Sequence, residues 1–173
     1  MRALWIPILL LAVPAHAEIF VDVGASASRV EAKIALIDDP VDSSDGGLHV
    51  GVGARRSIGE RGDIGVRLEL DSVDSDLLLA VRALDYRRHV SEKLAVGVFI
   101  GAARLDLATP AYGYYFGAGV TLKAFLPRWD LSLDLRFGDN VARDNLLPAD
   151  PQGGSPDNFY DVTGLSVYLS YRF

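Results

Sequence analysis

The sequence predicts an all-β fold, and within that class an eight-stranded antiparallel up-and-down transmembrane β-barrel. Three observations support the prediction. Apolar and polar residues alternate with a period of two in eight segments, as in strands whose two faces meet different surroundings. Glycines and long charged side chains share the polar face of these segments. The first 17 residues are organised as an export signal.

The predicted strands follow one another along the whole chain after the export signal. In the first strand, Ile19, Val21 and Val23 alternate with polar or small residues, whereas the alternation is least regular between Leu77 and Leu84. The eight segments are 19–28, 48–55, 64–71, 77–84, 94–101, 114–123, 131–138 and 165–173. Soluble barrels and sandwiches alternate in the same way, so the pattern alone leaves an exported soluble barrel open.

The composition of the polar face distinguishes these alternatives. Glycine weakens a solvent-exposed strand, but inside a narrow barrel a glycine makes room for a neighbour as long as arginine. Gly51, Gly53 and Gly65 are among the glycines at such positions. We therefore expect this face to line the lumen, with its opposite charges paired, because an unpaired buried charge is costly. The predicted lumen charge network, which would plug the barrel without an open pore, consists of Asp22, Arg55, Arg67, Glu69, Asp71, Arg82, Lys123, Asp134, Arg136 and Arg172.

The connections between predicted strands alternate between long and short. Long loops are expected at 31–47, 104–113 and 139–158, a shorter acidic loop at 71–76, and tight turns at 57–62, 89–93 and 126–128. Transmembrane barrels carry their short turns at the periplasmic end, so both chain termini are expected there. Aspartates crowd the opposite end. The basic residues expected at the periplasmic end are Arg55, Arg56, Arg61, Arg87, Arg88, Lys93 and Arg128.

Aromatic residues fit two girdles around the predicted barrel, one at each membrane interface. The periplasmic girdle would contain Phe125, Trp129, Tyr171 and Phe173, and the outer girdle Tyr114, Phe116, Phe137 and Phe159. Tyr86 has the wrong parity for the periplasmic girdle. This indicates a β-bulge or a register shift in the fourth strand.

Residues 1–17 are predicted to be a cleavable signal peptide, followed by a barrel domain at 18–173. Arg2 supplies the positive start, residues 3–13 the apolar stretch, and Ala15, His16 and Ala17 the small-x-small motif before the cleavage point. The apolar stretch is much shorter than the roughly twenty residues that a membrane-spanning helix needs. A membrane anchor is therefore the weaker interpretation.

The composition excludes several classes of function. The chain has no cysteine, which removes disulfides, thiolate metal sites and cysteine catalysis. Its net charge is −6 and no basic stripe is evident, so nucleic-acid binding is not expected. No cofactor or metal is predicted. Residues 42–47 contain aspartates and glycines but lack the ordered ligand spacing and terminal glutamate of a calcium loop.

The C-terminal segment is the most specific motif. Leu169, Tyr171 and Phe173 occupy alternating apolar positions at the end of the chain. The segment resembles the last strand of bacterial outer-membrane proteins, which implies that these residues are the signal read by the barrel-assembly machinery. With the strand-turn-strand of residues 86–97, the chain resembles the small bacterial outer-membrane β-barrel family of opacity-type and outer-membrane-protein-A-type barrels. Its end at Phe173 implies no peptidoglycan-binding domain.

The resemblance also implies a location and partners. A protein of this family is an integral component of the bacterial cell outer membrane, with periplasmic termini. It would contact outer-membrane lipid and lipopolysaccharide, and during biogenesis it would meet periplasmic chaperones and the barrel-assembly machinery. A monomer without a nucleic-acid partner is expected.

The residues offer one weak candidate for catalysis. Lipid A deacylase and palmitoyltransferase barrels have similar sizes and act through His and Ser at the outer rim. Here His49 is expected in the lumen, after Ser43, Ser44 and Asp45, whereas His89 is expected in a periplasmic turn. Ordinary hydrogen bonding is the commoner role for such residues, and no catalytic residue is assigned. We expect a non-enzymatic protein that serves envelope structure or surface interaction. A lipid A-modifying hydrolase or acyltransferase and a narrow small-solute channel are the alternatives.

Overall fold

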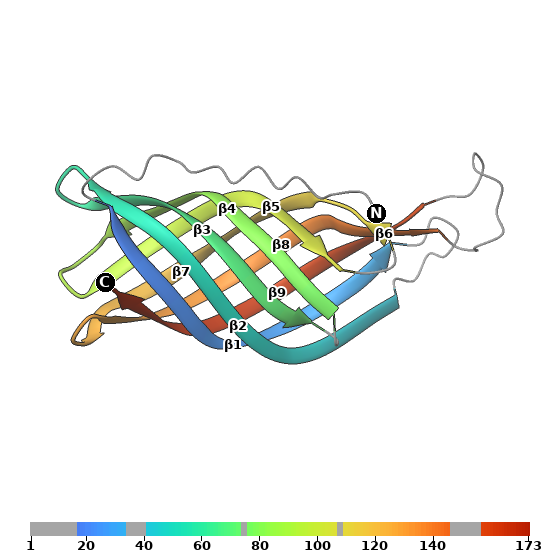
Figure 1. The fold of residues 1–173 in the computed structure, drawn as a ribbon, viewed down its shortest axis with the longest axis horizontal. Helices are drawn as coiled ribbons and strands as arrows, with labels where there is room; N and C mark the ends of the chain where they lie inside the picture. The colour runs from blue at the N-terminus through green and yellow to red at the C-terminus, as the bar shows by residue number, and fades with distance from the viewer. Residues whose placement is uncertain (1–16, 34–40, 74–75, 107–108, 146–156) are drawn as a thin grey trace.

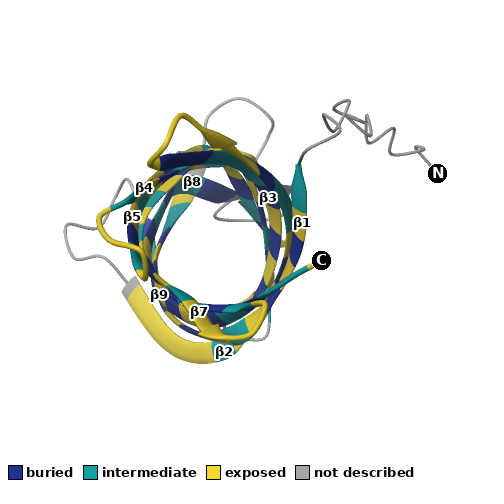
Figure 2. Cartoon of the chain, turned by 90° about the vertical axis from the view of Figure 1, so that its left-hand side faces the viewer, coloured by how far each residue is buried: buried dark blue, intermediate teal, exposed yellow. Residues whose placement is uncertain are grey.

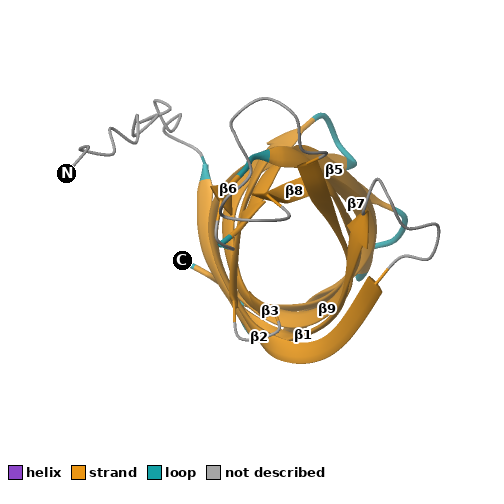
Figure 3. Ribbon diagram, turned by 90° about the vertical axis from the view of Figure 1, so that its right-hand side faces the viewer, coloured by secondary structure: helices purple, strands orange, loops and turns teal. Residues whose placement is uncertain are grey.

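Eight long antiparallel strands and one short strand form a single closed sheet. The computed structural model describes residues 17–33, 41–73, 76–106, 109–145 and 157–173. The strands are β1 (Glu18–Lys33), β2 (Val41–Ile58), β3 (Gly62–Val73), β4 (Asp76–His89), β5 (Leu94–Leu105), β6 (Thr109–Pro110), β7 (Gly113–Leu126), β8 (Trp129–Asn145) and β9 (Asp157–Arg172). Their order is β6-β8-β7-β5-β4-β3-β2-β1-β9, and pairing of β8 with β9 closes the ring (Figures 1 and 3). The predicted eight-stranded antiparallel barrel is confirmed, and β6 adds a short pairing to the end of β8.

The outer face of the barrel is apolar. Successive side chains of a strand point to opposite faces, and buried and exposed residues alternate along the strands (Figure 2). Each long strand contributes exposed apolar side chains, such as Val23, Val50, Leu68, Val81, Val98, Val120, Leu133 and Val167. Because closure of the ring pairs the backbone of every long strand, such a surface meets the requirements of a transmembrane barrel. Among the described residues, no helix is long and apolar enough to cross a membrane.

The strands extend further than the alternation predicted. Lys33 ends β1 and Val41 begins β2, and Glu31 pairs with Asp42, so much of the predicted loop 31–47 is strand. The ends of the predicted loop 139–158 are also strand, since β8 continues to Asn145 and β9 begins at Asp157, whereas residues 146–156 lie outside the described residues. Backbone pairing holds these ends together where their side chains no longer alternate in polarity. The tight turns lie at the same end as the C-terminus (Figure 1), and the predicted signal peptide, apart from Ala17, lies outside the described residues.

A single β-bulge interrupts the alternation of β4. The register shifts on both sides of this strand, and Ala83 is the extra residue opposite β3 and β5. As a result Ala83 and Leu84 both face outward, whereas Asp85 faces the lumen and Tyr86 the outside. The expected irregularity in the fourth strand is confirmed, and it explains the parity of Tyr86.

Aromatic contacts occur at both ends of the outer face. At the turn end, the Tyr171 ring lies 5.0 Å from that of Trp129 and 5.1 Å from that of Phe173. At the other end, Phe116 and Phe137 stack with their ring centroids 5.6 Å apart. These residues are members of the two predicted girdles. The apolar band of the outer face lies between the two girdles.

Candidate functional site in the barrel lumen

Charged side chains fill the middle of the lumen and are shielded from solvent. The buried charged residues are Asp22, Arg55, Asp63, Arg67, Glu69, Asp71, Arg82, Asp85, Arg87, Asp130, Asp134 and Arg136. They come from β1, β2, β3, β4 and β8, and their inward direction follows from strand alternation. Glycines at the inward positions between them leave the space that the arginines occupy. At Gly97, for example, an added Cβ would approach Arg87 Cγ to 3.0 Å.

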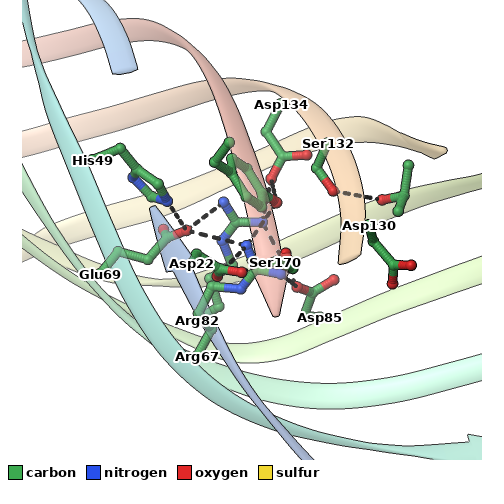
Figure 4. Close-up of polar contacts among 12 residues, drawn as sticks. Asp22, His49, Arg67, Glu69, Arg82, Asp85, Asp130, Ser132, Asp134 and Ser170 are labelled. Atoms are coloured by element: carbon green, nitrogen blue, oxygen red, sulfur yellow. Dashed lines mark hydrogen bonds and ion pairs between the residues drawn. The ribbon is translucent and has the colours of Figure 1, made fainter. Parts of the chain in front are cut away.

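Arg82 lies at the centre of this network. Its Nη2 atom is 2.6 Å from Glu69 Oε1, and its Nη1 atom is 2.6 Å from Asp134 Oδ2 (Figure 4). The guanidinium also lies over the Phe99 ring, 3.5 Å from the centroid. One arginine thus joins carboxylates from β3 and β8, which lie on different sides of the ring. Such pairing at close range is what makes a buried charge tolerable.

Tyr168 on β9 connects two further arginines to the same carboxylate. Its hydroxyl accepts hydrogen bonds from Arg67 Nη1 at 2.6 Å and Arg87 Nη2 at 2.9 Å, and donates one to Asp134 Oδ2 at 2.7 Å. Arg67 also pairs with Asp22 at 3.2 Å. The hydroxyl and the ion pairs therefore form one continuous network across the lumen.

The network continues toward the loop end through Asp71. Arg136 donates to Asp71 Oδ2 at 2.6 Å, and His49 Nδ1 lies 2.8 Å from Asp71 Oδ1. Tyr115 donates from its hydroxyl to Glu69 at 2.9 Å. His49 and Asp71 have no exposed surface, so these contacts are made without competition from bulk water.

At the turn end a second set of pairs lies closer to solvent. Arg55 pairs with Asp130 at 2.8 Å and with Glu18 at 3.1 Å, and Arg172 reaches both acids at 3.5 Å. Arg172 is a quarter exposed. The predicted network member Arg172 therefore lies at the rim rather than among the central charges.

Lys123 also lies at the rim. Its Nζ atom is 3.1 Å from His89 Nε2 and 3.9 Å from Asp63 Oδ2. His89 Nε2 lies 2.7 Å from the Asp63 carboxylate, and Ser57 donates to the other oxygen at 2.9 Å. Burial opposes ionisation of Asp63, but the contacts from His89, Ser57 and Lys123 outweigh burial and lower its pKa below the usual value for aspartate.

Several members of the network were not predicted from the sequence. Arg87 was expected in the periplasmic basic cluster, but it is buried in the lumen beside Tyr168 and Asp85. The bulge at Ala83 brings Asp85 and Arg87 to the inner face, and a strict period of two does not anticipate it. The sequence signal that could have identified Tyr115, Tyr168 and Asp130 is their parity, because each occupies an inward position of its strand.

An apolar cluster lies in the lumen next to the charges, at the loop end. It consists of Val73, Leu78, Ala80, Phe99, Ala103, Leu105, Tyr115, Val141, Ala142 and Val162, with Val30 and Tyr160 packed against it. A second bulge, in β8 around Asn140, brings Val141 and Ala142 to the inner face. From the sequence, a network of paired charges was expected to plug the lumen, and an apolar cluster was not anticipated. We call this set the apolar plug, and its ten buried members are each 5% exposed or less.

The arrangement gives little support for a catalytic or metal site. His49 is fully buried, and its Nδ1 contacts Asp71 rather than a serine. Ser44 pairs in register with Arg29, away from the lumen, so the considered relay of Ser43, Ser44, Asp45 and His49 is not assembled at an accessible surface. Within the ranges that the structure describes, no group of three or more His, Cys, Asp or Glu side chains is placed to hold a metal ion.

Comparison with known proteins identifies the fold. No family model and no curated protein matches the chain. The outer-membrane protein Ail of Yersinia pestis, solved in complex with the heparin analogue sucrose octasulfate, is similar at 13% identity and a TM-score of 0.53, over 91% of this chain and 99% of Ail. A de novo designed transmembrane β-barrel is similar at 13% identity and a TM-score of 0.50, over 90% of this chain and 95% of the design. The chain therefore has the fold of small transmembrane β-barrels.

Proposed function

We propose that the protein is an integral component of the bacterial outer membrane, with periplasmic termini and a closed lumen, and that it serves envelope structure or surface interaction. The main support is the combination of an apolar outer face with an interior that holds buried, paired charges and the apolar plug. A soluble barrel would not gain from exposing Val23, Val50 and Val98, each about half exposed, around its girth. The similar fold of Ail agrees with this placement.

Membrane placement has a direct test. The protein should be recovered with detergent-extracted outer membrane after expression in a Gram-negative host, and it should migrate differently on gels when unboiled. The mass of the recovered chain should correspond to cleavage after Ala17, which leaves Glu18 at the mature N-terminus. Recovery in the soluble periplasmic fraction would remove the proposal.

The side chains that occupy the lumen argue against the channel alternative. An ion crossing the barrel would have to break the pairs of Arg82 with Glu69 and Asp134 and then pass the apolar plug. The refolded protein should therefore give no single-channel current in planar bilayers in which its insertion is verified by protease protection. A porin in the same bilayer provides the positive control, and reproducible unitary currents from this protein would support the channel instead.

We propose that the protein is not an enzyme. The buried position of His49 and its contact with Asp71 support a structural role for this side chain. Deletion of the gene should leave the lipid A profile unchanged by mass spectrometry. A changed profile that wild-type protein restores and His49→Ala does not would instead support the alternative of a lipid A-modifying hydrolase or acyltransferase.

Recognition by the barrel-assembly machinery and periplasmic chaperones during biogenesis is part of the same proposal. Leu169 and Tyr171 lie on the outer side of β9, and Phe173 is 73% exposed beyond its end. The exposed ring of Phe173 is available to a partner. Phe173→Ala should lower the amount of assembled barrel in cells while leaving refolding of the purified chain in detergent unchanged. Equal loss in both experiments would assign Phe173 to folding alone.

A further inference from the structure

An apolar groove crosses the outer face of the barrel obliquely. Its volume is about 580 Å³, and it is lined by Tyr86 and Arg88 on β4, Val96, Gly97 and Val98 on β5, Ala118, Gly119 and Val120 on β7, Leu133 and Leu135 on β8, and Leu165 on β9. The groove follows two rows of residues paired across the strands. One row contains Arg88, Val96 and Val120, and the other contains Tyr86, Val98 and Ala118.

Small residues form the floor of this groove. Ala118 lies between the larger outward residues Phe116 and Val120 of β7, and between Val98 and Leu135 on the neighbouring strands. A methyl group at this position leaves a depression, because these four neighbouring positions carry branched or aromatic side chains. The depression is apolar along its length except at Arg88 and Tyr86.

Arg88 marks the turn end of the groove. It is the last residue but one of β4, whereas Leu165, at the other end, lies in the middle of β9. Arg88 is exposed, and its side chain makes no hydrogen bond or ion pair in the part of the chain that the structure describes, in contrast to Arg82 and Arg67 in the lumen. An unpaired guanidinium beside an apolar groove is complementary to a phosphate that carries an acyl chain.

The dimensions of the groove fit one leaflet of a bilayer. It crosses four inter-strand steps, which at about 4.8 Å each give a length of roughly 19 Å. In a barrel whose strands tilt by about 45°, this length corresponds to a height of roughly 13 Å, close to half of the hydrocarbon thickness of about 30 Å. A chain lying in the groove would thus extend from the periplasmic interface to the middle of the membrane.

We propose that this groove binds a phospholipid of the periplasmic leaflet, with the phosphate at Arg88 and one acyl chain over Ala118. The inference rests on the proposed transmembrane placement, because only that placement puts Arg88 at the level of the periplasmic headgroups. Arg56, also exposed, occupies the same cross-strand row as Tyr86 two strands away, and adds positive charge to the turn end of the outer face.

Native mass spectrometry of the full-length mature protein in detergent tests this site. The probes are dipalmitoyl phosphatidylglycerol and dipalmitoylglycerol, which has the same chains without a phosphate. Arg88→Gln should weaken retention of phosphatidylglycerol about fivefold, the effect of one basic residue near an anionic lipid surface, and leave dipalmitoylglycerol unchanged. Ala118→Phe, which fills the groove, should lower retention of both lipids.

Two matched variants separate a defined site from general lipid contact. Arg128→Gln removes a different exposed basic residue at the turn end. Ala102→Phe enlarges an exposed outward alanine of β5, as Ala118→Phe does on β7. Neither Arg128 nor Ala102 lines the groove. Both should retain phosphatidylglycerol as the wild type does. If Arg128→Gln weakens retention as much as Arg88→Gln, or Ala118→Phe retains lipid as Ala102→Phe does, the site is overturned. The transmembrane placement has its own test in fractionation, so its failure is distinguishable from failure of the site.

Discussion

Arg82 Nη1 on β4 donates a hydrogen bond of 2.6 Å to Asp134 Oδ2 on β8, across the lumen between strands that are not neighbours in the sheet. Both side chains are buried. Arg82 also pairs with Glu69, and Asp134 also accepts a hydrogen bond from Tyr168. The pair therefore connects opposite walls of the barrel. It can form only when the ring of strands is complete.

Removing one member of this pair should destabilise the barrel strongly. We expect Asp134→Ala to cost about 3–5 kcal/mol, because it leaves the Arg82 guanidinium buried without its partner. The change is measurable as a shift of the urea midpoint at which the heat-modifiable band of the refolded protein disappears. The control is Asp139→Ala, which removes an exposed ion pair with Lys33 and should cost about 1 kcal/mol or less. Equal shifts for the two variants would contradict a central role for Asp134.

The apolar plug should contribute to stability in addition to the charges. Phe99 is 5% exposed, contacts Tyr115 at a ring distance of 5.4 Å and lies under Arg82. We expect Phe99→Ala to cost about 3–5 kcal/mol by leaving a cavity in the lumen. Phe116→Ala removes an aromatic ring from the outer face, where the ring is 45% exposed, and should cost clearly less in the same urea titration. If Phe116→Ala lowered the free energy of unfolding more than Phe99→Ala, the outer face rather than the lumen would hold the more stabilising aromatic contacts.

Glycine at position 119 should be required for packing beside Asp134. A Cβ on Gly119 would lie 1.8 Å from Asp134 Oδ1 and 2.8 Å from the Leu133 carbonyl oxygen. We expect Gly119→Ala to cost about 1–3 kcal/mol through overpacking. At Gly46 the nearest atom to an added Cβ is 3.8 Å away, so Gly46→Ala should change the free energy of unfolding by less than about 0.5 kcal/mol. A neutral Gly119→Ala would show that the Asp134 side chain can move aside.

The pH dependence of stability should include a contribution from Asp63. Its contacts with His89 and Ser57 lower its pKa in the folded barrel. The unfolded chain therefore binds more protons near and below the ordinary aspartate pKa of about 3.9, and stability falls as the pH drops through that range. Urea midpoints at about pH 5 and about pH 3 should differ less for Asp63→Asn than for the wild type. Asp45→Asn, at an exposed position, is the control and should keep the wild-type difference.

The local alternation of residues was sufficient to predict much of the molecule. Strand faces depend on a period of two, which is a property of consecutive residues, so the outward position of Val98 and the inward position of Arg67 follow from their neighbours in the sequence. The same parity predicted that Glu69, Arg82 and Asp134 would share one surface. The aromatic residues near both ends of the apolar segments likewise indicated the girdles.

Other features depend on contacts between strands that are far apart in the sequence. The bulge at Ala83 moves Asp85 and Arg87 into the lumen, and the bulge near Asn140 supplies Val141 to the apolar plug; both depend on how adjacent strands pair. The sequence by itself determined a barrel with an apolar outside and a charged inside. The tertiary structure decided which charges meet, as Arg82 meets Asp134, because that choice depends on the register at which eight strands close into a ring.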